Sequence, residues 1–471
     1  MNTNGDAPLD VLVSGDLLVD GVPTPGAVGI AGGRVAYIGL GQGSDAPAAR
    51  QYLDRAGCWL LPGAVDAHVH TLSTPAEGIV RATSAAAAGG VTTIIDMPYD
   101  AEQPINSADL LRAKIEAVGR EAVVDMALFA TVAPRGPSPD AEVLAMAEAG
   151  ACAFKLSTME AHPVRFPRLP DDRLFEVFRA IARTGLTATV HAENQFIVDT
   201  LTARRRAGGV PGDLAAHGST RPPVAEAEAI GRALELAHWA GVRLHVAHIS
   251  IGRGIDLLAR ARVDGGPATG ETCLHYLLFA EDDARRLGTH AKINPPLRSR
   301  QEVEALWAAV ETGLLQAITS DHAPWPAASK QRDDLFDAPS GAPGVEVLLP
   351  LLLDEARRRG VALQTVVDLV TAGPARCYGL YPRKGRLALG ADGDLVAYDP
   401  AGHGVVDAAT HQSVSGWSPY QDRVYRGTIA TTIAGGIVVY DDGQVVAEPG
   451  TGRFVRPSQA IKRNAYGPTG R

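Results

Sequence analysis

Hydrophobic and polar positions divide the chain into three regions. Residues 1–61 and 387–471 consist of short β-rich runs separated by glycine, such as DVLVSG near the start and GTIATTIAGGIVVYDDG near the end. Between these regions, eight β-rich runs alternate with segments whose apolar residues recur at helical spacing. Strands that alternate with helices favour a parallel sheet with helices packed against it.

The eight central runs predict the strands of a closed barrel. They are PGAVDAHVH, VTTIIDMP, VVDMALFA, ACAFKLS, LTATVHAEN, RLHVAHIS, GETCLHYL and QAITSDHAP. Residues 107–122, 171–185 and 224–241 are predicted helices, and several such segments begin near Ser or Asp and end at Gly. Eight repeats indicate a (β/α)8 TIM barrel over 62–386, with a doubly wound open sheet as the alternative. The segments 1–61 and 387–471 would form a small β-sandwich domain, the latter segment also supplying a C-terminal tail.

Composition and charge narrow the possible partners. The chain of 471 residues is 46% hydrophobic, and its formal charge of −9 gives no reason to expect a nucleic acid or an anionic membrane as partner. The N-terminus lacks the pattern of a signal peptide, and no apolar run reaches the roughly 18 residues of a membrane span. Four widely spaced cysteines without a C-x-x-C pair are typical of reduced thiols. These observations predict a cytoplasmic protein.

Polar residues capable of binding a metal gather at the ends of the predicted strands. Residues i and i+2 of a strand point to the same side, so two histidines of DAHVH can close on one ion. Taken singly, each such residue also has a structural interpretation, as a hydrogen-bonded side chain at the rim of a sheet or the cap of a turn. Active sites of barrels lie at the carboxyl ends of the strands, where six candidates would converge: His68, His70, Lys155, His191, His248 and Asp321.

Lys155 is the unusual member of this set, because an ammonium group repels a cation. A lysine that is desolvated beside metals has a lowered pKa and reacts as the free amine. Such an amine can capture CO2 and become a carbamate, which is an anionic ligand with two oxygens. A carbamate would bridge two metal ions about 3.5–4 Å apart, the separation typical of two-metal sites.

The motifs DAHVH, FK, VHAEN, AHIS and SDHAP, in this order on strands one, four, five, six and eight, resemble the amidohydrolase superfamily. More narrowly, they are similar to its cyclic-amidase branch of hydantoinases, dihydropyrimidinases, allantoinases and dihydroorotases. ETCLHYL, KINPPLR and GAPGVEVLLPLLL support the resemblance, which extends over nearly the whole chain.

The resemblance implies a binuclear metal centre, usually of zinc, with manganese or cobalt as alternatives. By position, His68, His70 and Asp321 would hold one ion, and His191 and His248 the other. Carboxylated Lys155 and a hydroxide would bridge them. The hydroxide would attack the ring carbonyl while Asp321 acts first as base and then as acid, which opens the C–N amide bond of a cyclic ureide or imide.

Departures from the family patterns bear on the substrate. Leu72 stands where dihydroorotases carry the arginine of HxHxR, so the carboxylate clamp is missing there. Glu160 replaces a tyrosine of D-hydantoinases and dihydropyrimidinases, and Ser340 replaces their asparagine. The segments around DDRLFEVFRAIARTG and WSPYQDRVYRG look most like L-hydantoinase and allantoinase.

We therefore expect a hydantoinase-type enzyme, with an allantoinase as the first alternative. Dihydropyrimidinase, dihydroorotase, a metal-dependent deaminase and a non-catalytic scaffold relative are further alternatives. Asn294 and Ser340 are candidates for contacting the amide edge of the substrate ring, although both residues could merely shape turns. Relatives are commonly dimers or tetramers, so a homo-oligomer is expected as well.

Overall fold

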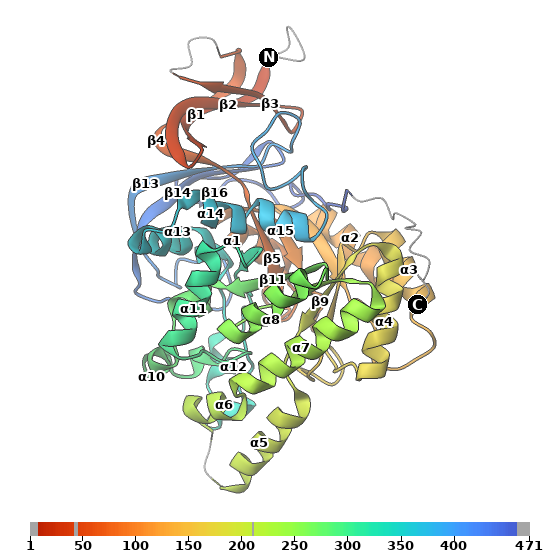
Figure 1. Ribbon diagram of the computed structural model, residues 1–471. Coiled ribbons are helices and arrows are strands. Elements are labelled where there is room, and N and C mark those ends of the chain that lie inside the picture. The colour runs from red at the N-terminus through yellow and green to blue at the C-terminus, as the bar shows by residue number, and fades with distance from the viewer. Residues whose placement is uncertain (1–7, 42–45, 210–211, 459–471) are drawn as a thin grey trace.

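Two eight-stranded sheets organise the computed structural model, which describes residues 8–41, 46–209 and 212–458 (Figure 1). Residues 1–7, to which the prediction about a signal peptide refers, and residues 459–471 of the expected tail lie outside the described residues. None of the described helices combines the length and apolar character that a membrane span requires.

The central sheet is the predicted parallel barrel. Its neighbouring strands follow the chain order, and every residue of most of these strands is buried, as expected for strands covered on both faces. The eight strands are β5 (Ala64–Val69), β6 (Val91–Asp96), β7 (Asp125–Ala130), β8 (Ala153–Ser157), β9 (Thr187–His191), β10 (Arg243–Val246), β11 (Ala268–Cys273) and β12 (Ala317–Thr319).

The ends of β5 and β12 meet and close the barrel. Val69 and His322 form a parallel bridge, in which His70 N donates to His322 O over 2.9 Å and His322 N donates to His68 O over 3.2 Å. This closure joins the chain that follows β12 to the motif that ends β5. It therefore places Asp321 beside the two histidines of DAHVH.

Helices with one apolar face surround the barrel. In α4 (Asp171–Thr184) two aspartates occupy the first turn, Arg183 the last, and Gly185 ends the helix with a φ of 72°. The other helices around the barrel include α1 (Gly78–Ala88), α2 (Ala108–Glu121), α3 (Asp140–Ala149), α7 (Pro223–Ala240), α8 (Gly252–Val263), α11 (Arg300–Glu311) and α13 (Leu348–Arg359). The predicted helices 107–122, 171–185 and 224–241 correspond to α2, α4 and α7.

Further helices follow the barrel strands. In Figure 1, α5 (Gln195–Ala207) and α6 (Leu214–Thr220) lie at the end of the barrel opposite to the N-terminal strands. One prediction is wrong in detail: GETCLHYL is not all strand, because β11 ends at Cys273 and Leu274–Leu278 form α9. Tyr276 Oη donates to Pro295 O and Trp307 Nε1 to Leu277 O, contacts that hold α9 inside the protein. The remaining short helices are α10 (Ala284–Leu287), α12 (Ala327–Lys330), α14 (Leu363–Leu369) and α15 (Ala372–Cys377).

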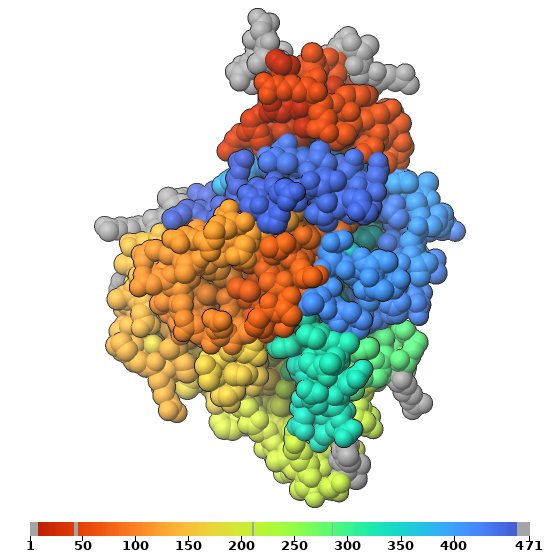
Figure 2. Space-filling model, turned by 180° about the vertical axis from the view of Figure 1, so that it is seen from behind, coloured from red at the N-terminus to blue at the C-terminus, as the bar shows by residue number. Residues whose placement is uncertain are grey.

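The second sheet combines both ends of the chain, as predicted. β4 runs parallel to β1 and antiparallel to β13, so an N-terminal strand and a C-terminal strand share hydrogen bonds. Figure 2 shows the red N-terminal strands stacked on the blue C-terminal segment above the barrel. The strands are β1 (Leu9–Val19), β2 (Val22–Ala31), β3 (Arg34–Leu40), β4 (Ala49–Pro62), β13 (Leu395–Val405), β14 (Val424–Ala434), β15 (Ile437–Asp441) and β16 (Gln444–Val445). The boundaries 1–61, 62–386 and 387–471 stay a prediction.

A buried lysine links this sheet to the barrel. Lys384 Nζ lies 2.5 Å from Asp125 Oδ2 on β7 and 2.7 Å from Asp394 Oδ2, which immediately precedes β13. A third carboxylate, Asp392, lies 3.1 Å away. One ammonium therefore neutralises carboxylates from both sheets in a place without access to water.

We expect Lys384→Met to lower the free energy of unfolding by about 3–5 kcal/mol, because it leaves buried carboxylates without a cation. Urea unfolding followed by fluorescence measures this change. Arg383→Met is the matched control, because Arg383 contacts the same Asp392 but is 36% exposed, and such a pair contributes about 0–1 kcal/mol. Equal losses in the two variants would contradict a special role of Lys384.

Candidate metal centre

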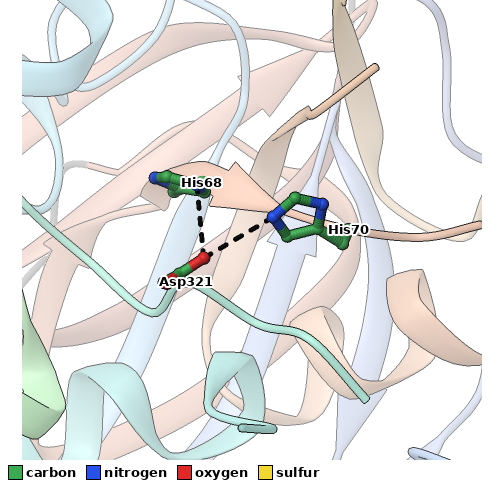
Figure 3. Close-up of side chains that lie close together, drawn as sticks. All are labelled: His68, His70 and Asp321. Carbon is green, nitrogen blue, oxygen red and sulfur yellow. Dashed lines mark ion pairs between the residues drawn. The ribbon is translucent and has the colours of Figure 1, made fainter. Parts of the chain in front are cut away.

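His68, His70 and Asp321 meet at the carboxyl end of the barrel. Asp321 Oδ1 lies 3.2 Å from His68 Nε2 and 3.6 Å from His70 Nε2. Figure 3 shows both imidazoles, which come from the end of β5, directed at the same carboxylate oxygen. One ligand atom from each of the three residues lies within 4.8 Å of those of the others, a spacing that suits a shared metal ion.

The other three predicted residues join the same cluster. His191 Nδ1 lies 2.9 Å from His248 Nε2, and the His248 ring centroid lies 5.4 Å from that of His68. Lys155 Nζ, from the middle of β8, lies 3.4 Å from His68 Nε2. The structure therefore brings all six predicted residues together, although they come from five strands.

Unusual backbone geometry aims two of these side chains. β10 ends at Val246 and β12 at Thr319, and the residues two positions further, His248 and Asp321, have φ values of 39° and 46°. Residues other than glycine rarely adopt this left-handed region, which is costly and concentrates at functional sites. The strained turns direct both side chains to the cluster, which supports a functional role for them.

Two buried glutamates orient the histidines. Glu271 Oε1 accepts from His68 Nδ1 over 2.6 Å, and its other oxygen lies 3.2 Å from His245 Nε2. Glu193 Oε2 lies 2.8 Å from His191 Nε2 and also accepts from Arg221 over 2.7 Å. A carboxylate on one ring nitrogen fixes the tautomer that offers the other nitrogen as a ligand. His68 would thus offer Nε2, and His191 would offer Nδ1.

Burial keeps the potential ligands in forms that can bind a cation. It lowers the pKa of Lys155 to about 8, against the opposing charges of Glu271 and Asp321. Burial also lowers the pKa of His68, and it lowers that of His248 well below the usual value. Burial alone would raise the pKa of Asp321, but the neighbouring His68 and His70 hold it well below the usual value. Neutral imidazoles, an ionised carboxylate and an easily deprotonated amine form a suitable donor set for divalent metals.

His70 and His248 each present one ring nitrogen to the cluster. Nδ1 of His70 and Nδ1 of His248 are buried without a hydrogen-bond partner, while the Nε2 atoms of both rings face the cluster. Cys273 and His275 offer a further ligand atom each near Asp321, but neither residue lines the cavity described next. The six predicted residues therefore fit a metal centre that is open to a ligand.

A cavity of about 430 Å³ leads from this cluster to the surface. Asn294 and Ser340, the two predicted substrate contacts, both line it. The Asn294 Oδ1 atom is buried and has no hydrogen-bond partner. The Ser340 carbonyl accepts from Trp325 Nε1 over 2.8 Å, so this loop is fixed to the segment after Asp321. The volume suits a small-molecule ligand.

Sequence reasoning missed several residues of the site. Glu193 lies within the motif VHAEN and Glu271 opens ETCLHYL, so their place in recognised motifs was the available signal. Tyr99, Arg165 and Trp325 also line the cavity, but they come from irregular loops after β6, β8 and β12. No periodicity in those loops indicates which side chains point inwards.

Comparison with known proteins agrees with this geometry. The model of a family described as the amidohydrolase family matches residues 59–439. An allantoinase of Rubrobacter xylanophilus is 40% identical over 96% of this chain and 98% of its own length. An L-hydantoinase of Paenarthrobacter aurescens is 35% identical over 95% of this chain and 98% of its own length. The solved structure of an L-hydantoinase from Arthrobacter aurescens covers 95% of this chain and 100% of its own, with a TM-score of 0.90 and 34% identity.

Proposed function

The chain belongs to the amidohydrolase family, and we propose that it opens five-membered cyclic ureides with the help of two divalent metal ions. It is a hydrolase of cyclic amides of the hydantoinase type, with allantoinase as a close alternative. The observation that carries the metal-dependent mechanism is the gathering of four histidines, Lys155 and Asp321 at the bottom of one cavity.

We propose a division of these ligands between two ions. His68, His70 and Asp321 would hold the first, and His191 and His248 the second. Zinc is proposed first, with manganese and cobalt as alternatives, because imidazole and carboxylate ligands accommodate all three. When bound, such ions polarise a carbonyl group and supply hydroxide near neutral pH.

Lys155 would connect the two halves of the centre as a carbamate. Its buried amine is deprotonated more easily than an exposed one, since burial lowers its pKa to about 8. The free amine adds to the carbon of CO2 and loses a proton, which leaves an anion with two oxygens. The change from a cation to an anion removes the repulsion that an ammonium would exert on bound metals.

Asp321 would move the proton during ring opening. Its carboxylate faces His68 and His70 at the bottom of the cavity, and their proximity keeps it ionised. It would accept a proton from the attacking water and then deliver that proton to the departing ring nitrogen. Asn294 and Ser340 would hold the amide edge of the ring, and the unpartnered Asn294 Oδ1 offers an acceptor for a ring N–H.

The ring is expected to be hydantoin-like first and allantoin second. Leu72 in place of the dihydroorotase arginine does not line the cavity, so no carboxylate clamp stands at that position. To test the proposal, the protein is loaded with zinc and bicarbonate and its hydrolysis rates are measured on a panel of substrates. The panel contains both enantiomers of 5-substituted hydantoins, allantoin, dihydrouracil, dihydroorotate and simple imides. Hydrolysis of five-membered ureides is the expected result. Exclusive turnover of six-membered rings, or no turnover and no retained metal, would overturn it.

Glu271→Gln should weaken metal retention by about 10- to 100-fold, because an amide no longer fixes the tautomer of His68. The carboxylate of Glu271 is ionised, since His68 and His245 together hold its pKa at about 2 despite burial. Competition with a chelator, followed by elemental analysis, measures the loss. Glu302→Gln is a control at a distance from the site, where the carboxylate accepts from Gly252 N. Unchanged retention in Glu271→Gln would contradict the orienting role.

We also propose that the enzyme acts in the cytoplasm as a homodimer or homotetramer. The four cysteines are free, three of them buried, which is consistent with a reducing compartment. Mass measurement of the native protein tests the oligomeric state.

A further inference from the structure

Arg165 stands out among the charged residues that line the cavity. No carboxylate lies within ion-pair distance of its guanidinium in the part of the chain that the structure describes, although the side chain is only partly exposed. Two other arginines of the lining are paired, Arg221 with Glu193 over 2.7 Å and Arg206 with Asp337 over 2.8 Å. Lys292 donates to the carbonyls of the loop around Phe336. Among the described residues, Arg165 thus differs from these two arginines in having no carboxylate partner.

The guanidinium is held in place but keeps unused donors. It carries five N–H groups, and Nη1 donates to Ser73 O over 3.0 Å, which is the hydrogen bond that the described residues provide for the side chain. Its Cζ atom lies 4.9 Å from the ring centroid of Tyr99 and 5.8 Å from that of Trp325. Cation–π contacts of this kind orient a guanidinium without consuming its N–H groups.

The ring of Tyr99 connects Arg165 to the metal cluster. Tyr99 packs edge-on against His70 with ring centroids 5.6 Å apart, so a single ring separates Arg165 from a predicted ligand. Trp325 follows Asp321 by four residues and is tied to Ser340, a predicted contact of the substrate ring. A ring bound at the cluster would therefore present its substituent to the wall that Arg165 forms.

We propose that Arg165 selects ring substituents that carry an acceptor oxygen, such as the carbonyl of a ureido group or a carboxylate. The inference rests on the proposed function, because it needs a cyclic ureide at the cluster. Several N–H donors in one plane suit paired oxygens. An aryl substituent offers no such acceptor and would leave the donors of Arg165 without partners, which is costly in a partly buried site.

The test compares Arg165→Met with the zinc-loaded wild type on four substrates: hydantoin, allantoin, hydantoin-5-acetic acid and 5-benzylhydantoin. A hydrogen bond to a charged group contributes about 1.5–3 kcal/mol, so kcat/KM for allantoin or the acetic acid should fall about 10- to 100-fold. The value for hydantoin should stay within about twofold of the wild type, because hydantoin has no ring substituent that could use the guanidinium. The value for 5-benzylhydantoin should rise, because the variant no longer leaves N–H donors without partners beside the aryl group. A loss on allantoin alone identifies a ureido group, and a loss on the acetic acid alone identifies a carboxylate.

Two further variants separate recognition from loop support. Arg168 belongs to the same loop, but its guanidinium lies over the ring of Phe196 and outside the cavity. Arg168→Met should therefore leave the ranking of the four substrates by kcat/KM unchanged. Arg165→Lys keeps the charge but loses the planar donors, so it should retain more activity on the acetic acid than on allantoin. Equal losses on all four substrates, or no loss on any, would overturn the inference. If the wild type hydrolyses none of these four five-membered rings, the proposed function fails instead.

Discussion

Lys155→Ala should abolish ring opening, with a fall in kcat/KM of about 10³-fold or more, since even one lost electrostatic group of an active site costs about 10²–10³. The variant loses the group that we propose to bridge both ions, so metal content should fall together with activity. Steady-state kinetics and elemental analysis on the same samples measure both quantities. A deaminase-type centre with one metal would predict intact activity instead.

Chemical rescue makes this prediction specific to the carbamate. In Lys155→Ala the shortened side chain leaves space, so acetate or propionate added with zinc should restore part of the activity. Lys155→Met is the matched control, because its side chain fills that space and should prevent rescue. The wild type loaded with ¹³C-labelled bicarbonate should give a carbamate carbon signal in NMR spectra that Lys155→Met lacks. A wild type that is fully active without CO2 would contradict the bridging role.

Periodicity alone predicted the barrel because its strands are buried on both faces and its helices carry one apolar side. The run ACAFKLS corresponds to β8 (Ala153–Ser157), and LTATVHAEN contains β9 (Thr187–His191). The metal cluster was predictable for a related reason: in a parallel barrel every strand end faces the same side, so polar residues at those ends must meet. His68, His191 and Asp321 are therefore found together although more than a hundred residues separate each from the next.

Other features depend on contacts that no short stretch of sequence contains. LHYL is compatible with a strand or a helix, and its packing against Trp307 selects the helix. Glu271 becomes an orienting residue through the placement of β11 relative to His68, which the sequence of β11 does not indicate. Arg165 lies in an irregular loop, where Tyr99 and Trp325 from two other loops determine its direction. Loops at the mouth of the barrel thus contain the residue to which we assign specificity, and periodicity does not predict its position.

Asp321→Asn should lower kcat by about 10²–10⁴-fold, the range that general acid–base catalysis contributes. An asparagine amide can still offer an oxygen to a metal, but it does not accept a proton from water or deliver one to the ring nitrogen. The loss should therefore appear in kcat while metal content falls less than in Lys155→Ala. Substrates whose ring nitrogen leaves easily, such as N-acylated hydantoins, should lose less activity because they need less protonation.

Asp199→Asn is the matched control for Asp321→Asn. Asp199 lines the same cavity and loses the same charge in this substitution, but its side chain is exposed and pairs with Gln195 rather than with the histidines. It should keep kcat on hydantoin close to the wild type, which separates proton transfer from a general change in the charge of the cavity. The kcat of Asp321→Asn could instead fall by the same factor for substrates with good and with poor leaving groups while the variant retains both ions. That result would show that the Asp321 carboxylate does not protonate the leaving nitrogen. The proton would then have to reach that nitrogen from solvent.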